Sequence, residues 1–433
     1  MTTPWSDLRC IACARRYPAT EVRYRCDCGD LLEVRHDLNR LRAESPDLRR
    51  RFDERRSIQT GPHASGVWRY HELVLPDLPI DSVVTCGEGN TPLYTSAALS
   101  AAFDTADLAL KHEGENPTLS FKDRGMTSGV SWAQHLGVSH VACASTGDTS
   151  AAMAAYAAHA RGLEAVVFLP HEKVSPEQLA QPIVYGARTL ALDTDFDGCM
   201  RLVQAVCERH PIYLLNSMNS FRLEGQKTIG LEVCQQRDWR APDWFVIPVG
   251  NAGNVSALGK GMLEAHALGL IDRLPRIAGV QAKAADPLYR GFQGGFRERV
   301  RMDAGETLAT AIRIGDPVSH DKAARIIQRF HGVVESVEEA ELMDAKAAAD
   351  RAGVAVCPNS GVALAGLRKL RAAGTIPADA SVVVILTAHG MKFSQVDVAY
   401  HTGALAHCPP THPNAPEPIA ASIEAVCSTL GLG

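Results

Sequence analysis

The chain has 433 residues, of which 46% are hydrophobic and 21% charged, as is typical of a globular protein with two or three domains. Its formal net charge of -5 gives no basic field for nucleic acid, and no apolar run reaches the length of a membrane span. The first residues do not resemble a signal or transit peptide, and most of the 12 cysteines are scattered singly, as in reduced cytosolic proteins. We therefore expect a cytoplasmic, enzyme-sized protein without nucleic-acid or membrane partners.

Two close pairs of cysteines set residues 1–35 apart from the rest of the chain. Cys10 and Cys13 are separated by two residues, whereas Cys26 and Cys28 are separated by only one. Four thiolates at knuckle-like turns predict a small zinc ribbon. The alternative is a knuckle that binds no metal, since the second pair is shorter than the usual spacing.

Short β-branched runs alternate with alanine-rich helical segments through most of the remaining chain. Strands are predicted at residues 108–111, 138–144, 165–169, 189–192, 212–215, 244–249, 277–281 and 382–387. This alternation predicts an α/β fold of parallel sheets with helices on both faces. We divide the chain into a zinc-ribbon-like segment (1–35), an arm that leads into the catalytic body (36–105), a smaller α/β domain (106–235), a larger α/β domain (236–405) and a tail (406–433).

Lys122 lies just inside a predicted helix, after the strand at 108–111 and a polar turn. Ser120 is a candidate N-cap for this helix, because its hydroxyl can accept from the free amides of the first turn. The helix dipole then disfavours the cationic form of the Lys122 amine and favours the nucleophilic one. These properties suit a Schiff-base lysine, although a surface lysine in a first helical turn has the same local pattern.

A glycine turn follows the buried strand at 244–249 and precedes a helical run. It consists of Gly250, Asn251, Ala252, Gly253 and Asn254. Glycines let backbone amides approach an oxyanion at a helix N-terminus. The turn lacks the Lys-Ser/Thr ending of a nucleotide loop and the third glycine of a dinucleotide fingerprint, so it predicts a site for one small phosphate. A plain strand-to-helix turn is the alternative.

Three further polar groups lie at predicted strand ends. They are a hydroxyl-rich turn of Ser145, Thr146, Asp148 and Thr149, a cluster of Asn216, Ser217 and Arg222, and the single hydroxyl of Thr387. The first suits a carboxylate or phosphate at a helix N-terminus, and the second offers a planar guanidinium for a phosphate dianion. For Arg222 the alternative is an ion pair with Glu224 on a helix surface. Thr387 would lie at the sheet edge where open α/β sheets bind ligands.

One lysine, one phosphate loop and two anion sites describe a pyridoxal-phosphate enzyme that acts on an anionic amino acid. Five motifs carry a more specific resemblance: Asn-Pro-Thr-x-Ser-Phe-Lys-Asp, Ser-Thr-Gly-Asp-Thr-Ser, Asn-Ser-x-Asn-x-x-Arg-x-x-Gly-Gln, Gly-Asn-x-Gly-Asn and Thr-Ala-His-Gly. They occur in the order found in threonine synthases, and the chain resembles the plant-type branch of that family from about Gly87 to Lys392.

The resemblance implies a fold-type II enzyme with its active site between two parallel-sheet domains, pyridoxal 5'-phosphate as cofactor and O-phospho-L-homoserine as substrate. The products would be L-threonine and phosphate, in the last step of threonine biosynthesis. It implies that Lys122 forms the Schiff base and then acts as acid and base. The remaining implied roles are Gly250 to Asn254 for the cofactor phosphate, Thr387 for the pyridine nitrogen, Ser145, Thr146 and Thr149 for the substrate carboxylate and part of its phosphate, and Asn216, Ser217 and Arg222 for the leaving phosphate.

Asp148 stands where many threonine synthases have asparagine, although the plant-type branch resembles this chain. An ionised carboxylate beside the cofactor's 3'-oxygen would repel it unless the two share a proton. Asp148 therefore either shares that proton as a cofactor contact or turns away to cap the helix, and we expect the cap.

Two competing functions share part of this pattern. A threonine or serine dehydratase of the same fold would have the lysine and the glycine loop, but it has no use for the arginine cluster. A non-catalytic homologue would keep the fold and the zinc ribbon for protein binding, and the intact Lys122 argues against it. Plant-type relatives have a dimer interface, so the resemblance leaves a homodimer open.

Overall fold

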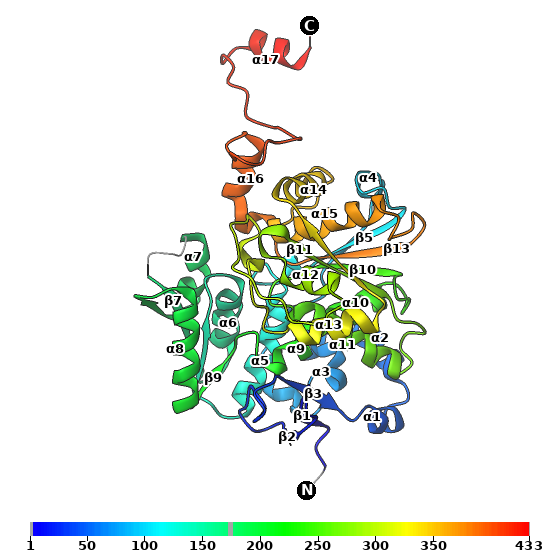
Figure 1. The fold of residues 1–433 in the computed structure, drawn as a ribbon, viewed down its shortest axis with the longest axis vertical. Helices are drawn as coiled ribbons and strands as arrows, with labels where there is room; N and C mark the ends of the chain where they lie inside the picture. The colour runs from blue at the N-terminus through cyan, green and yellow to red at the C-terminus, as the bar shows by residue number, and fades with distance from the viewer. Residues whose placement is uncertain (1–2, 172–175, 433) are drawn as a thin grey trace.

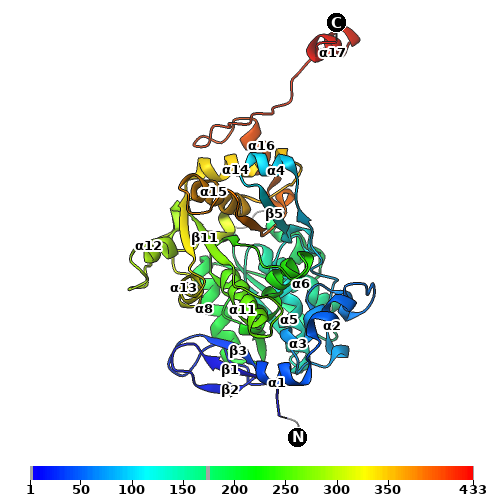
Figure 2. The same ribbon diagram turned by 90° about the vertical axis from the view of Figure 1, so that its right-hand side faces the viewer.

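Three β-sheets form the framework of the chain, which a computed structural model describes over residues 3–171 and 176–432 (Figure 1). Two sheets are built mainly of parallel strands joined by helices, and the third is a small antiparallel sheet. The small sheet and the C-terminal helix lie at opposite ends of the molecule, and the parallel sheets lie between them (Figures 1 and 2).

The largest sheet has six strands and is buried on both faces. Its order is β12 (Val333–Val337), β11 (Arg276–Ala282), β10 (Trp244–Pro248), β13 (Ser381–Leu386), β5 (Asp107–His112) and β4 (Leu93–Tyr94), with only β4 antiparallel. Along β10, Phe245 and Ile247 belong to one hydrophobic core, whereas Trp244 and Val246 belong to another. Helices therefore cover both faces, as parallel sheets require.

The helices around this sheet form two layers. On one face α15 (Pro358–Ala372) packs against β10, β11 and β13, and α14 (Glu339–Arg351) packs on α15. The others in this region are α10 (Thr228–Gln236), α11 (Gly253–Ala267), α12 (Pro287–Gln293) and α13 (His320–Arg329).

The second sheet has four parallel strands. Its order is β8 (Arg188–Leu192), β7 (Glu164–Pro170), β6 (His140–Ala144) and β9 (Ile212–Leu214). Both α6 (Asp148–His159) and α8 (Phe196–Arg209) contact β6 and β7, while α5 (Lys122–His135) packs on α6 and on α9 (Ser220–Gln226). The remaining helix here is α7 (Pro176–Val184).

The N-terminal sheet consists of β2 (Arg16–Pro18), β1 (Ser6–Cys10) and β3 (Leu32–His36), and β3 contacts α9. Helices outside the sheets are α1 (Leu38–Glu44), α2 (Leu48–Arg55), α3 (His71–Val74), α4 (Ala97–Ala102), α16 (Ser394–His401) and α17 (Ile423–Leu430). Short 3-10 turns are η1 (Pro62–Ala64), η2 (Trp68–Tyr70), η3 (Ile80–Ser82), η4 (Glu113–Glu115), η5 (Lys283–Ala285), η6 (Thr310–Ile312) and η7 (Gly390–Phe393).

The α/β class and the strands predicted from residue 108 onward are present in the structure, with ends that shift by at most two residues, whereas a strand expected around Tyr24 is absent. The sequence did not predict β12 or the strands of the N-terminal sheet. The proposed boundary at residue 106 does not separate the two parallel sheets, because β5 lies in the six-stranded sheet with strands from the second half of the chain. The division into domains therefore stays a prediction.

A buried charge network fixes the helix that carries Lys122. The Arg124 guanidinium donates to both Glu113 oxygens, at 2.6 and 2.8 Å, and to Glu232 at 3.0 and 3.2 Å. Lys111 also donates to Glu232, so two cations balance two carboxylates. All four side chains are buried. Removing one member would leave an uncompensated charge in the interior.

We expect Arg124→Met to destabilise the protein by about 3–5 kcal/mol, because it leaves the buried Glu113 carboxylate without a cation while Glu232 keeps only Lys111. Arg240→Met is the matched control, since Arg240 is exposed and lies 3.8 Å from an exposed Asp238. Urea unfolding followed by circular dichroism compares the midpoints. Equal midpoints for the two variants would contradict a stabilising role for the network.

Candidate active site

Lys122 is the first residue of α5, and its amide donates to the Ser120 hydroxyl at 3.3 Å. The predicted N-cap was one residue early: the helix is capped at Phe121, although Ser120 still binds a first-turn amide. The Lys122 amine lies 4.3 Å from the centre of the Phe121 ring. The side chain is therefore held in a partly apolar environment at the start of a buried helix.

Burial is the main cause that lowers the pKa of Lys122 to about 7, and the nearby Arg222 guanidinium lowers it further. The negative charge of Asp148 opposes this shift of the Lys122 pKa. The sequence predicted a neutral amine from the helix dipole, whereas desolvation is the larger effect. Near neutral pH a substantial fraction of Lys122 is uncharged, which is the form that a nucleophile or a general base needs.

The end of β13 is tied directly to the segment that carries Lys122. The Phe121 amide donates to the Thr387 carbonyl at 3.0 Å, and Ser120 pairs with Ala388 in an isolated bridge. The Thr387 amide donates to the Ser360 hydroxyl at 2.9 Å. Two residues that are more than 260 positions apart in sequence, Lys122 and Thr387, are thereby brought to one place.

The glycine turn forms a strained, closely packed corner at the start of α11. Ala252 has a positive φ of 61° and precedes the first helical residue, Gly253. A Cβ on Gly250 would lie 2.8 Å from the Ile312 backbone, so only glycine fits there. Within residues 3–171 and 176–432, neither polar atom of the buried Asn254 side chain has a hydrogen-bond partner, and the Ser319 hydroxyl also lacks one.

Unpartnered polar atoms beside free helix amides fit the phosphate of a cofactor. Buried polar groups are normally hydrogen-bonded, and their absence of partners here indicates that a polar ligand completes the site. The backbone amides and the side chains of Asn254 and Ser319 are neutral hydrogen-bond donors. They suit a phosphate whose negative charge is already stabilised by the N-terminus of α11.

Asp148 does not cap α6, contrary to our expectation. The N-cap is Gly147, which has no side chain, and Asp148 instead forms an ion pair of 2.6 Å with Lys392. Lys392 balances the carboxylate charge that the sequence alone left unexplained. The hydroxyl-bearing Ser145, Thr146 and Thr149 are half-buried around the same helix start.

Asn216 joins the turn after β9 to the turn after β6. Its carboxamide accepts from the Ala144 amide at 3.0 Å and donates to the Ala144 carbonyl at 2.8 Å. Ser217 follows it and is half-buried. The two predicted anion turns are therefore neighbours held at a fixed spacing.

Arg222 is buried, with 2% of its surface exposed, and it has no ion-pair partner among the described residues. One of its nitrogens donates to the Leu215 carbonyl at 2.9 Å, while Nε has no partner within the described chain. The alternative of a surface ion pair with Glu224 is wrong, because Glu224 pairs with Lys227 and Lys260. Burial lowers the pKa of Arg222 to about 10, which still leaves it cationic at neutral pH.

Sequence reasoning missed three groups at this site: Lys392, Ser319 and Asn359. Lys392 follows Thr387 by five residues, and its charge complements Asp148, which was the available signal. Asn359 lies at the start of α15 and has an unpartnered, buried Oδ1 within the described residues. Ser319 and Asn359 gave no signal, because a single polar residue at a helix start is common.

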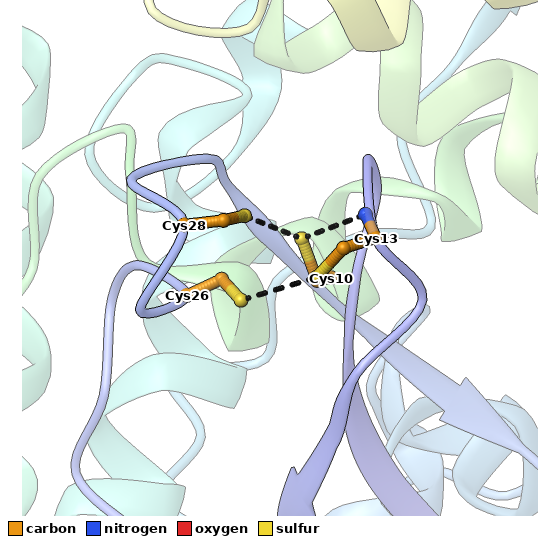
Figure 3. A group of neighbouring side chains, drawn as sticks. All are labelled: Cys10, Cys13, Cys26 and Cys28. Atoms are coloured by element: carbon orange, nitrogen blue, oxygen red, sulfur yellow. Dashed lines mark hydrogen bonds between the residues drawn. The ribbon is translucent and has the colours of Figure 1, made fainter.

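The four cysteines form a separate group in the N-terminal sheet and its turns, with their side chains directed toward one another (Figure 3). All four Sγ atoms lie within 4.8 Å of one another.

The family described as pyridoxal-phosphate dependent enzyme matches residues 84–388, and the chain belongs to this family. Within it the chain groups with threonine synthases. It is 46% identical over 394 residues to threonine synthase 2, chloroplastic, of Arabidopsis thaliana, with 89% of this chain and 76% of the relative covered. It is 43% identical to threonine synthase of Methanocaldococcus jannaschii, with 89% and 92% covered.

The solved structures support the fold. Threonine synthase from Escherichia coli superposes with a TM-score of 0.62 at 22% identity, covering 80% of this chain and 81% of that chain. This likeness shows the fold-type II architecture and, at that identity, nothing finer. Among the described residues no helix is long and apolar enough to span a membrane.

We expect the apoenzyme to combine covalently with pyridoxal phosphate at a rate that rises with pH and is half-maximal near pH 7, because deprotonation creates the reactive Lys122 amine. The solvated amine of free N-acetyl-lysine, measured in a parallel reaction, should show its midpoint near pH 10. Arg222→Leu should move the Lys122 midpoint upward, since it removes a cationic neighbour. Stopped-flow absorbance measures both; a rate that still rises steeply at pH 9 contradicts the assignment.

Proposed function

We propose that this chain uses pyridoxal phosphate to convert O-phospho-L-homoserine and water into L-threonine and phosphate. The observation that carries the proposal is the buried Arg222 guanidinium, which lacks a carboxylate partner among the described residues and lies close enough to Lys122 to lower its pKa. A buried unpaired cation is costly unless an anion completes it. The substrate phosphate is such an anion.

Residues on two sides of Lys122 fit the cofactor. Its phosphate would occupy the turn from Gly250 to Asn254, where backbone amides and the unpartnered Asn254 side chain are available. Thr387 would hydrogen-bond the pyridine nitrogen, and the ion pair of Asp148 with Lys392 would present a compensated charge to the ring. When bound, the cofactor supplies an electron sink for carbanion chemistry.

The chain's own residues then supply position and proton transfer. The reaction removes protons from Cα and Cβ, releases phosphate from Cγ, adds the hydroxyl of water at Cβ, and returns protons to Cγ and Cα. The Lys122 amine has a pKa near 7, so at neutral pH it can both accept and return protons. Because it is tethered beside the substrate, it acts with a far higher effective concentration than a free amine.

Two anion sites hold the ends of the substrate. The turn of Ser145, Thr146 and Thr149 offers hydroxyls and helix amides to the carboxylate and to part of the phosphate. Arg222, with Asn216 and Ser217, would hold the leaving phosphate, whose charge rises as the Cγ–O bond breaks. A guanidinium in a water-poor site stabilises that charge strongly.

The alternatives explain less of this site. A dehydratase would use Lys122 and the glycine turn but would leave Arg222 buried without an anion. A non-catalytic binding protein has no need of a lysine whose pKa is lowered. We keep the predicted homodimer and the cytoplasmic location as proposals; the Arabidopsis relative is named as chloroplastic, which leaves the compartment to experiment.

The direct test incubates the purified protein with pyridoxal phosphate and O-phospho-L-homoserine. We expect phosphate and threonine in equal amounts, and neither from Lys122→Ala, which should fold normally because alanine is a good residue for a first helical turn. The variant should also lose the visible absorption of lysine-bound cofactor. Release of 2-oxobutanoate from threonine, without synthesis of threonine, would instead establish a dehydratase.

Arg222→Leu should lower kcat and raise KM, with a combined loss of roughly 3 kcal/mol in transition-state stabilisation, or about 100-fold in kcat/KM. Arg222→Lys should recover only part of this loss, because a point charge lacks bidentate geometry. The cofactor absorption should stay normal in both, and Arg237→Leu, on a half-buried ion pair with Asp107, serves as the control. If Arg222→Leu instead lost the cofactor absorption and kept the wild-type kcat/KM, Arg222 would bind the phosphate of the cofactor and not that of the substrate.

A further inference from the structure

The four N-terminal cysteines have the arrangement of a closed tetrathiolate site (Figure 3). The Sγ atoms of Cys10 and Cys28 are 3.5 Å apart, as are those of Cys13 and Cys26. A tetrahedral zinc site with Zn–S bonds of about 2.3 Å places its sulfurs about 3.8 Å apart. These separations therefore suit one ion bound by all four sulfurs.

The backbone around the cysteines supports thiolates. The amides of Ala12 and Cys13 both donate to the Cys10 sulfur at 3.4 Å, and the Tyr17 hydroxyl lies 3.1 Å from the Cys26 sulfur. Donors that point at sulfur stabilise its anionic form, which is the form that binds metal.

The short second pair is accommodated by a tight turn. The Gly29 amide donates to the Cys26 carbonyl at 2.8 Å, and Gly29 has a φ of 89°, which favours glycine. The Cys26 amide in turn donates to the Asp30 carbonyl at 2.9 Å. This turn brings both Cys26 and Cys28 to face the first pair, so the one-residue spacing does not prevent tetrahedral binding.

The N-terminal sheet with its cysteine-bearing turns, here called the ribbon, is also joined to the helix that carries Arg222. The Ser220 hydroxyl on α9 donates to the Leu32 carbonyl of β3 at 2.7 Å, and Lys322 donates to the same carbonyl at 2.6 Å. On the next turn of α9, Glu224 lies 2.9 Å from the His36 Nε2 atom of β3. Arg222 is thus between two α9 residues that are anchored on the ribbon.

The strand that precedes Arg222 is anchored as well. The Leu214 amide, at the end of β9, donates to the Tyr24 hydroxyl of the ribbon at 2.6 Å. Leu215, whose carbonyl accepts from Arg222, is the next residue. The ribbon therefore contacts both segments that fix the guanidinium.

We propose that Cys10, Cys13, Cys26 and Cys28 bind one zinc ion, and that this zinc-stabilised ribbon positions α9 so that Arg222 meets the substrate phosphate. The positioning role rests on the proposed function, whereas zinc binding does not. Loss of the metal then acts on recognition of the substrate phosphate and leaves the cofactor, whose phosphate has its own turn, in place.

The metal is tested by elemental analysis of full-length protein purified without chelator. We expect one zinc per chain, lost in Cys13→Ser/Cys28→Ser, which changes the two exposed members of the set, and retained in Cys427→Ser, which changes a cysteine of α17. Cobalt substitution of the wild type should give the visible bands of tetrahedral thiolate coordination, a result that does not depend on any variant folding. Metal-free protein, two disulfides in place of four thiols, or iron in place of zinc would overturn the assignment.

Kinetics test the positioning. The zinc-free double variant should show a KM for O-phospho-L-homoserine raised at least about five-fold, with the cofactor absorption unchanged. Ser220→Ala, which keeps the metal but removes the bond from α9 to β3, should raise KM in the same direction with one zinc still bound. An unchanged KM in both variants overturns the positioning role, while failure of the wild type to use this substrate overturns the proposed function and leaves the zinc measurement valid.

Discussion

The buried guanidinium of Arg222 is the feature on which the rest of the active site depends. An interior cation without a carboxylate costs folding free energy, and Arg222 has no carboxylate partner in the part of the chain that the structure describes. The same charge disfavours protonation of Lys122, so a group that binds anions also prepares the base. In the proposed function, this one charge serves both recognition of the substrate and proton transfer, and the anchored helix α9 holds it in place.

The class of fold follows from the sequence because buried parallel strands are continuous apolar runs. That signal located strands such as β10 and β13, whose residues are almost all hydrophobic. It missed β12, where Glu335 and Ser336 interrupt the run at the edge of the sheet. It also missed the membership of β5 in the six-stranded sheet, since strand order depends on pairing between distant segments.

The site was predictable where its residues are contiguous in sequence. The glycine turn and the hydroxyl turn each lie within five or six residues, so a local pattern was sufficient to single them out as candidates. Pairings over long separations were not accessible: Asp148 meets Lys392 across 244 positions. The choice between a free and a paired Arg222 depended on whether Glu224 had other partners, and Lys260, which supplies one, is 36 residues farther along.

The double hydrogen bond between Asn216 and Ala144 has a consequence for selectivity by length. It joins the end of β6 to the turn after β9, so the sites proposed for the carboxylate and for the phosphate cannot separate or approach independently. The distance between the two turns is therefore fixed. If the two turns hold the carboxylate and the phosphate as proposed, a phosphorylated amino acid with one methylene fewer than phosphohomoserine would engage one end or the other without spanning both.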